Sequence, residues 1–383
     1  MLRKQFVLTL ITLAILGAAA VVAIMIAKGY RVSPKEGTIF GTGILSITST
    51  PDQASVYLDG HLTTATNANI NSLEPKKYKV RIIKDGFIPW EKEVEVRQGL
   101  VSDIKAALFP AIPSVYPLSF NSVSQVVLSP DTQRFVFVVP TSAETENPAQ
   151  SAKKNGIWVW DMSDRPVTFT RGREPHQILP GNSGIDLTQA VLKWSPDSNQ
   201  VLVTLPNQYF MLDANRLNDT PRDVTPIIKA TLKSWEEEEK LSNTARLEAL
   251  KDLNVRRTAS DSAFLKWSPD ETKIVHSKDG KTQFKVTDLI DSKTYDLPEA
   301  KSYSWLASSR HLVAVEADKQ LDSLVSGKIS IVEFDGGNKS VIFAGSLDSN
   351  AVISWSDGSR LLIVSSVPTP TGNKPNLFGI NLK

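Results

Sequence analysis

The sequence has no cysteine in its 383 residues, which excludes disulfide bonds, thiolate metal ligands, a cysteine nucleophile and a lipid-modified cysteine. Histidine is scarce as well, because only four are present, in separate segments that lack the spacing of metal ligands. Neither sign of charge is in excess, since 43 Lys and Arg nearly balance 41 Asp and Glu. The composition therefore gives no reason to expect a metal or a nucleic acid as a partner.

Catalytic motifs are missing too. The chain contains no G-x-S-x-G nucleophile elbow, no G-x-x-x-x-G-K-[ST] phosphate loop, no H-E-x-x-H and no EF-hand loop. Carboxylates are plentiful, but no pair of them stands out for acid–base catalysis. We therefore expect no catalytic residue, no cofactor and no metal, and we favour a protein that is not an enzyme.

One long apolar run lies near the N-terminus. Phe6 to Ala27 is 22 residues without a charge, and as a helix it would span about 33 Å, the thickness of one hydrocarbon core. Arg3 and Lys4 precede the run, which favours a cytoplasmic N-terminus and an exported C-terminal part. We expect residues 1–35 to form a cytoplasmic tip, a single transmembrane anchor in the cell membrane and a linker.

A cleaved signal peptide is the alternative interpretation of this run. Ala18 and Ala20 are small residues of the kind that precede a cleavage site. The apolar region of a signal peptide usually has only about 7–15 residues, however, and here it continues through Ile24, Met25 and Ile26. The length of the run favours an uncleaved anchor.

Residues 43–110 alternate between apolar and polar side chains with a period of two. Leu45 and Ile47 form one such pair, and Val56 and Leu58 form another. This alternation predicts strands with one buried face, and the Asp59-Gly60 pair predicts a turn between two of them. We expect a small antiparallel β-sandwich.

The same segment resembles the PEGA domain, a small β-sandwich of bacterial and archaeal surface proteins. The positions that carry the resemblance are Gly43, Leu45, Ile47, Ser49, Pro51, Ala54, Val56, Asp59, Gly60, Leu73, Pro75, Tyr78, Val80, Gly86 and Phe87. Lys76 departs from the pattern, because glycine is usual there. The resemblance implies a location at the envelope surface and no enzymatic activity.

Residues 111–383 contain an internal repeat, of which "LKWSPD" is the clearest copy and occurs at both Leu192 and Leu265. Each copy is a short apolar strand, a turn with serine and often aspartate, and a second apolar strand. The recurring bulky position is occupied by Leu128, Trp194, Trp267, Trp305 and Trp355. Further strand-like segments follow each copy, which gives about four strands per unit, as a propeller blade needs.

A packing argument explains the repeat. One four-stranded blade cannot bury both of its faces, so neighbouring blades bury them for each other. We therefore expect the tryptophans to fill the interfaces between blades, with a sugar-binding site lined by tryptophan as the alternative. The aspartates that should cap the turn amides at the blade corners are Asp131, Asp197, Asp270 and Asp357.

These corners resemble those of TolB-like and related WD40-like β-propellers. Five blades are apparent, and a sixth could lie in the interval between Trp194 and Trp267. Few residues follow the last repeat, so the last blade should borrow an outer strand from the segment that begins at Ser114. The predicted fold class is thus mainly β, with a transmembrane helix, a PEGA-type sandwich and a propeller of five or six blades.

A helical insertion interrupts the propeller pattern at about residues 229–255. Leu232, Trp235, Leu247 and Leu250 have near-helical spacing, and Ser234 with Glu237 matches a capping box. A break at Ser242–Thr244 would give a helical hairpin. This insertion could decorate a blade edge, or it could be a partner-binding arm that uses Trp235, Leu247 and Leu250.

Together these features predict an extracytoplasmic binding or scaffold protein that presents a propeller to envelope proteins or polysaccharide. A hydrolase that acts on envelope glycan or peptide, with its site in the propeller funnel, is the alternative. A sensor arm is a weaker option, because only about five residues precede the apolar run. The sequence identifies neither the ligand nor the oligomeric state.

Overall fold

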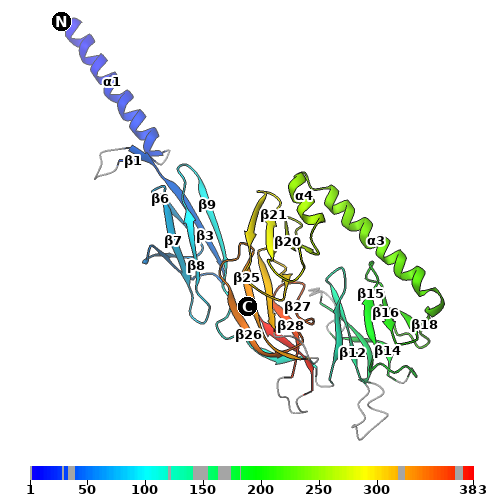
Figure 1. The fold of residues 1–383 in the computed structure, drawn as a ribbon. Coiled ribbons are helices and arrows are strands. Elements are labelled where there is room, and N and C mark those ends of the chain that lie inside the picture. The colour runs from blue at the N-terminus through cyan, green and yellow to red at the C-terminus, as the bar shows by residue number, and fades with distance from the viewer. Residues whose placement is uncertain are drawn as a thin grey trace. The chain divides into compact units, whose positions relative to one another are not determined.

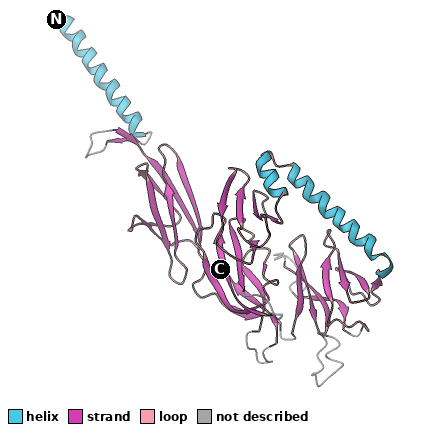
Figure 2. Cartoon of the chain, in the orientation of Figure 1, coloured by secondary structure: helices cyan, strands magenta, loops and turns pink. Residues whose placement is uncertain are grey.

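The computed structural model describes residues 2–27, 30–32, 39–119, 122–140, 154–162, 174–181, 183–317, 324–366 and 374–383. The chain divides into two compact units, Met1–Ile112 and Pro113–Lys383. Strands dominate both units, as Figure 2 shows.

The first unit begins with helix α1, Leu2–Ala27. The side chains described in this helix are those of residues 9–25, and nearly all of them are exposed. A search of the described part of the chain finds no helix with the length and apolarity needed to cross a membrane. A short hairpin follows, in which β1, Tyr30–Val32, pairs with β2, Ile39–Gly41.

Two sheets then form a sandwich. One has the order β6-β3-β9 and the other has the order β5-β4-β7-β8. The bounds are β3 Gly43–Thr50, β4 Ser55–Leu58, β5 His61–Ala65, β6 Ala68–Leu73, β7 Lys77–Ile83, β8 Trp90–Glu95 and β9 Val101–Ala107. The prediction of a purely antiparallel sandwich is wrong, because β3 pairs with β9 in parallel. Such a pair needs a long crossover, and here the second sheet supplies it.

The sandwich core is made by the alternating residues that the sequence singles out. Leu45, Ile47, Val56 and Val80 are completely buried between the two sheets. Gly43 lies so close to the next segment that a Cβ would be 2.5 Å from the backbone oxygen of Arg97. The absence of a side chain at Gly43 therefore allows these two segments to pack closely.

The described residues of the second unit form five four-stranded antiparallel sheets, which we call blades 1 to 5 in chain order (Figure 1). Blade 1 is β11 Ser124–Leu128, β12 Arg134–Val139, β13 Gly156–Asp161 and β14 His176–Pro180. Blade 2 is β15 Val191–Trp194, β16 Gln200–Thr204, β17 Tyr209–Asp213 and β18 Arg222–Asp223. Blade 3 is β19 Phe264–Trp267, β20 Lys273–Ser277, β21 Lys285–Asp288 and β22 Lys293–Asp296.

Blade 4 is β23 Ser302–Trp305, β24 His311–Ala317, β25 Val325–Glu333 and β26 Ser340–Leu347. Blade 5 is β27 Ile353–Ser354, β28 Arg360–Ser365, β29 Asn376–Asn381 and β10 Val115–Pro117. Strand β10 comes from the start of the unit and pairs with the last strand, with Val115 opposite Ile380. The predicted borrowed strand is therefore confirmed, and it links the two ends of the propeller.

The interval between Trp194 and Trp267 holds helices where a sixth blade could have been. A 3-10 turn, Thr225–Ile227, leads into α3, Ile228–Glu248, and α4 follows at Leu253–Ser260. The prediction of a break at Ser242–Thr244 is wrong, because α3 runs through all three residues. Serine, asparagine and threonine each cost a helix less than about 0.7 kcal/mol, which is too little to end one that is packed at both of its ends.

The predicted capping box is also wrong, because Ser234 lies inside α3 and not at its start. The chain turns at residues 249–252, and Asp252 caps α4 by accepting the backbone N–H of Asn254 at 2.8 Å. The short side chain of Asp252 places its carboxylate where it accepts backbone N–H groups of the first turn, as is typical of a helix N-cap.

Candidate functional site

Trp194 and Trp305 lie in interfaces between adjacent blades. They are 3% and 8% exposed. Trp194 packs in a cluster shared by blades 1 and 2, and its Nε1–H donates to the backbone oxygen of Val127 at 3.0 Å. Trp305 does the same between blades 3 and 4, with the oxygen of Lys266 at 3.1 Å. In both cases the acceptor lies one residue before the corresponding bulky position of the preceding blade.

Trp355 is buried in the interface between blades 5 and 1. It is 4% exposed, and its ring lies edge-on to Phe135 and Trp160 of blade 1, with centroids 6.3 and 6.2 Å away. The Arg360 guanidinium lies 4.1 Å from its ring centroid, which adds a cation–π contact. Its Nε1 atom has no hydrogen-bond partner within the described residues.

The four aspartates all cap their corners. Each carboxylate accepts a backbone N–H two residues further on, at 2.8–3.1 Å, from Gln133, Asn199, Thr272 and Ser359 respectively. The Ser195 hydroxyl also donates to Asp197, and this bond lowers the pKa of the Asp197 carboxyl. Each aspartate therefore stabilises its own turn, and the four carboxylates do not form one polar site.

A second contact locks neighbouring corners together. The N–H of Asp131 donates to the Ser198 hydroxyl of the next blade at 3.1 Å, and the N–H of Asp270 donates to Ser309 in the same way. In blade 3 the residue that corresponds to Ser198 and Ser309 is Glu271. Its carboxylate lies 3.4 Å from the Nε atom of Arg246, which belongs to helix α3.

Helix α3 bridges blades 2 and 3. Near its start, Leu232 and Trp235 pack against Leu202 and Met211 of blade 2. Near its end, Leu247 and Leu250 pack with α4 and with side chains of blade 3, namely Leu265, Trp267, Ile274 and Leu289. In Figure 1 the helix runs from the β18 end of blade 2 to α4, beside β20 and β21.

The middle of the bridge is in solvent, because every side chain of residues 236–246 is exposed. A helix that is polar all round in this way is typical of a span between two packed parts. The inner strands of blades 1 and 2, 3 and 4, and 4 and 5 lie against each other. We call α3 and α4 the helical bridge. The three residues of the predicted partner arm, Trp235, Leu247 and Leu250, attach it to the protein's own blades.

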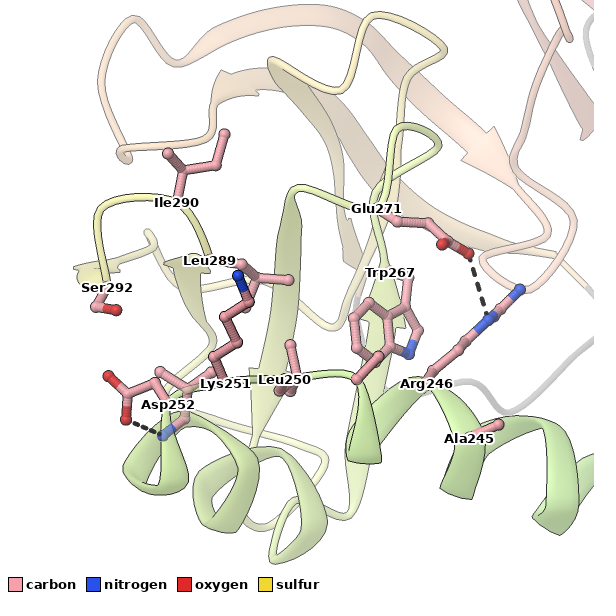
Figure 3. Close-up of a pocket in the computed structure, with 12 residues that line it drawn as sticks. Ala245, Arg246, Leu250, Lys251, Asp252, Trp267, Glu271, Leu289, Ile290 and Ser292 are labelled. Atoms are coloured by element: carbon pink, nitrogen blue, oxygen red, sulfur yellow. Dashed lines mark hydrogen bonds and ion pairs between the residues drawn. The ribbon is translucent and has the colours of Figure 1, made fainter.

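A cavity of about 730 Å³ opens where the helical bridge meets blade 3 (Figure 3), and we call it the bridge groove. Trp267 lines it and is only half-buried, unlike the tryptophans in the interfaces between blades. Leu250 and Leu289 lie beside Trp267, and Ile290 is 75% exposed at the rim. This volume is within the range of ligand-binding clefts, about 300–1,000 Å³.

The charged groups of the groove are mostly committed to structural contacts. Glu271 pairs with Arg246, and Asp252 accepts the N–H groups of Val255 and Asn254, which lower the pKa of its carboxyl. Lys251 makes no ion pair among the described residues and lies on the groove lining. Nowhere in the described part of the chain do three or more His, Asp or Glu side chains gather as a metal site would require. The groove is suited to binding, with an apolar floor and one available cation.

The sequence pattern singles out Trp267, Leu250 and the insertion, but it does not predict that they lie next to one another. The repeat predicted that Trp267 would fill an interface between two blades, and the structure places Trp267 against the helical bridge. Glu271 was the available signal, because it stands where blades 2 and 4 have serine at the corner. At this corner the side chain pairs with Arg246 of helix α3.

Comparison with known proteins gives one family match. Residues 42–111 match the PEGA domain. No curated protein matches the sequence.

Several solved propellers are similar in structure. TolB from Acinetobacter baumannii is 13% identical, with a TM-score of 0.22 over 81% of this chain and 61% of that one. The propeller domain of the Trilobed protease from Pyrococcus furiosus is 14% identical, with a TM-score of 0.21 over 67% and 65%. Putative TolB from Agrobacterium tumefaciens is 10% identical, with a TM-score of 0.21 over 80% and 90%. This chain therefore spans less than two thirds of the first two, and its architecture rests on the strand pairing above.

Proposed function

We propose that this protein is a non-catalytic binding protein of the cell envelope, anchored in the membrane by α1, that holds a partner macromolecule in the bridge groove. The observation that carries the proposal is the groove itself. The helical bridge packs on blade 2 at one end and on blade 3 at the other, and it leaves an open cavity beside Trp267, about 730 Å³ in volume.

The lining of the groove supports binding over catalysis. A hydrolytic site needs a nucleophile or a paired acid and base within hydrogen-bond reach of the substrate. Here Glu271 pairs with Arg246 and Asp252 caps helix α4, and the two carboxylates lie at opposite ends of the groove in Figure 3, so they do not form a paired acid and base. The apolar side chains of Leu250, Leu289 and Ile290 instead offer surface for a partner to bury.

Helix α1 supports the proposed anchor. Eight large apolar side chains of this helix are more than half exposed, with Leu13 at 72%; they are Leu10, Ile11, Leu13, Ile15, Leu16, Val21, Val22 and Ile24. Burial of each would contribute about 1.5–3 kcal/mol. Together they favour an apolar surrounding for the helix, and a membrane would provide one. The PEGA domain then follows as a spacer before the propeller in chain order.

In-cell crosslinking tests this function. A photoreactive residue at Ile290, which is 75% exposed on the groove rim, should capture one recurrent macromolecule from intact cells. The control is the same residue at Val341 on blade 4, which is 50% exposed and outside the groove. Equal capture at both positions would count against a binding role for the groove.

A second measurement separates binding from hydrolysis. The purified chain, incubated with envelope glycan fragments and with a peptide library, should leave both intact by mass spectrometry. Cleavage of either one would replace the binding role by the hydrolase alternative. Carbonate extraction of membranes tests the anchor separately, because an inserted α1 should keep the protein in the pellet.

A further inference from the structure

Resting on the proposed binding function, we infer that the partner in the bridge groove is an extended polypeptide segment. One backbone carbonyl of this segment accepts the Nε1–H of Trp267, and an acidic side chain of the segment pairs with Lys251. The groove lies between the helical bridge and blade 3, and the segment would there supply the carbonyl that a preceding blade supplies to Trp194 and Trp305.

The acceptor is inferred from the two regular interfaces. Trp194 and Trp305 occupy the same position of the repeat as Trp267, and each donates its Nε1–H to a backbone carbonyl of the preceding blade. By the same register, the acceptor for Trp267 would be the carbonyl of Lys193 in blade 2. The side chain of Lys193 instead faces the helical bridge, 3.9 Å from Glu239 and over the ring of Trp235. Among the described residues, Trp267 makes no hydrogen bond to blade 2.

The accessibility of Trp267 distinguishes it from Trp355. The indole N–H of Trp355 also has no partner within the described residues, but its side chain is 4% exposed between two blades. No ligand can reach that donor. Trp267 is half-buried and lines a cavity, so an incoming carbonyl can approach it. In Figure 3 the ring nitrogen of Trp267 lies on the side of Arg246, at one end of the groove.

A polypeptide fits this lining better than a glycan does. An extended chain presents a backbone carbonyl on every residue and side chains on alternating sides, as in peptides that add to a sheet edge. The apolar floor of Leu250 and Leu289 suits an aliphatic side chain of such a segment. Hydrogen bonds to sugar hydroxyls usually come from several free polar side chains, and Glu271 and Asp252 are already committed.

The charge of the groove indicates the acidic side chain. Arg246 and Glu271 neutralise each other, and Asp252 is used by the helix α4 N-terminus. Lys251 remains as a cation without an ion pair among the described residues. A segment with one aspartate or glutamate would therefore match the groove by pairing with this lysine.

The test uses the full-length protein in detergent with its indole nitrogens labelled with nitrogen-15, and two probe pools. One pool contains random nine-residue peptides with blocked ends and one Asp or Glu each, and the other contains neutral and acidic hexasaccharides. We expect selected peptides to shift the Trp267 indole signal and slow its hydrogen exchange. W267F, which keeps an apolar ring and removes the N–H, should weaken their binding about 5-fold, the effect of one neutral hydrogen bond.

Two variants sharpen the result. K251Q should weaken the acidic peptides about 2- to 5-fold and leave their uncharged analogues unaffected. The matched control is W194F, which removes the same donor from a closed interface and should leave peptide binding unchanged. The inference is overturned if no peptide binds, or if bound peptides leave the Trp267 signal in place.

The hexasaccharides separate this inference from the proposed function. If they move the Trp267 signal and peptides do not, the groove remains a binding site and its occupant is a glycan. If neither pool moves the signal and crosslinking from Ile290 captures nothing, the binding function itself fails.

Discussion

Blades 1 and 2 meet directly, whereas blades 2 and 3 are joined through a helix. At the first junction Trp194 is 3% exposed, its indole N–H reaches the neighbouring backbone, and the Ser198 hydroxyl locks the two corners. At the second junction Trp267 is half-buried, and Glu271 pairs with Arg246 of helix α3. Trp194 is thus part of a packed core, and Trp267 lines a cavity between blade 3 and the helical bridge.

The two tryptophans come from the same six letters, "LKWSPD". The segment forms the same strand and the same corner in both blades, so local structure follows from the repeat. What differs is the neighbour on one side of the sheet. In this chain the repeat determines the strand and the corner, and the neighbouring element determines whether the bulky residue is core, as Trp194 is, or lines a cavity, as Trp267 does.

Substitution of the two tryptophans gives the largest expected effect. W194A should lower the free energy of unfolding by about 3–5 kcal/mol, because it leaves a cavity between two blades. W267A removes contacts on one side of the ring only and should cost roughly half as much. Urea unfolding followed by tryptophan fluorescence measures both.

Equal losses for W194A and W267A would contradict the comparison. Such a result would mean that Trp267 is packed as tightly as Trp194 in solution. W235A serves as a third point, because Trp235 is 7% exposed between the helical bridge and blade 2. Its loss should resemble that of W194A.

The continuity of the helical bridge gives the next effect. N243P introduces proline in the exposed middle of α3, where it removes a backbone hydrogen bond and clashes with the preceding turn, at a cost of about 3 kcal/mol. The control is N243A, which keeps the helix and should be neutral or slightly stabilising. Far-UV circular dichroism and urea unfolding report the loss.

A hairpin at Ser242–Thr244 would tolerate this proline. If N243P were within about 0.5 kcal/mol of N243A, the usual range of surface substitutions, the chain would bend there. Blades 2 and 3 would then be joined by a hinge and not by a continuous helix.

Much of the propeller was predictable, because its strands follow from local patterns. Alternating apolar residues indicate the blades, and serine–aspartate corners mark all of them except blade 4; the pairing of β10 with β29 also agrees with the strand expected from the segment at Ser114. Parallel pairing of β3 and β9 was not predictable in this way. It depends on which strands meet in space, and periodicity along the chain carries no such information.

The bridge groove was only half predictable for a related reason. The spacing of Trp235 and Leu247 indicates a helix with apolar positions. It does not say that the first packs on blade 2 and the second on blade 3, with three exposed turns between them. The continuity of α3 through Ser242–Thr244 depends on these two attachments, and the letters in that stretch favour a break.

The corner lock gives the smallest effect and the most direct comparison of the two junctions. S198A removes the acceptor of the Asp131 N–H and should cost about 1 kcal/mol, and S309A should cost about the same between blades 3 and 4. Glu271 stands at the corner position that Ser198 and Ser309 hold in the other two blades. E271A breaks only an exposed ion pair, so it should lower the free energy of unfolding by less than about 0.5 kcal/mol. Thermal unfolding of the three variants at one pH and salt concentration ranks them. If E271A lowered the free energy of unfolding as much as S198A does, the contact between blade 3 and the helical bridge would stabilise the fold as strongly as the contact between blades 1 and 2. The groove would then be held together too rigidly to admit a partner.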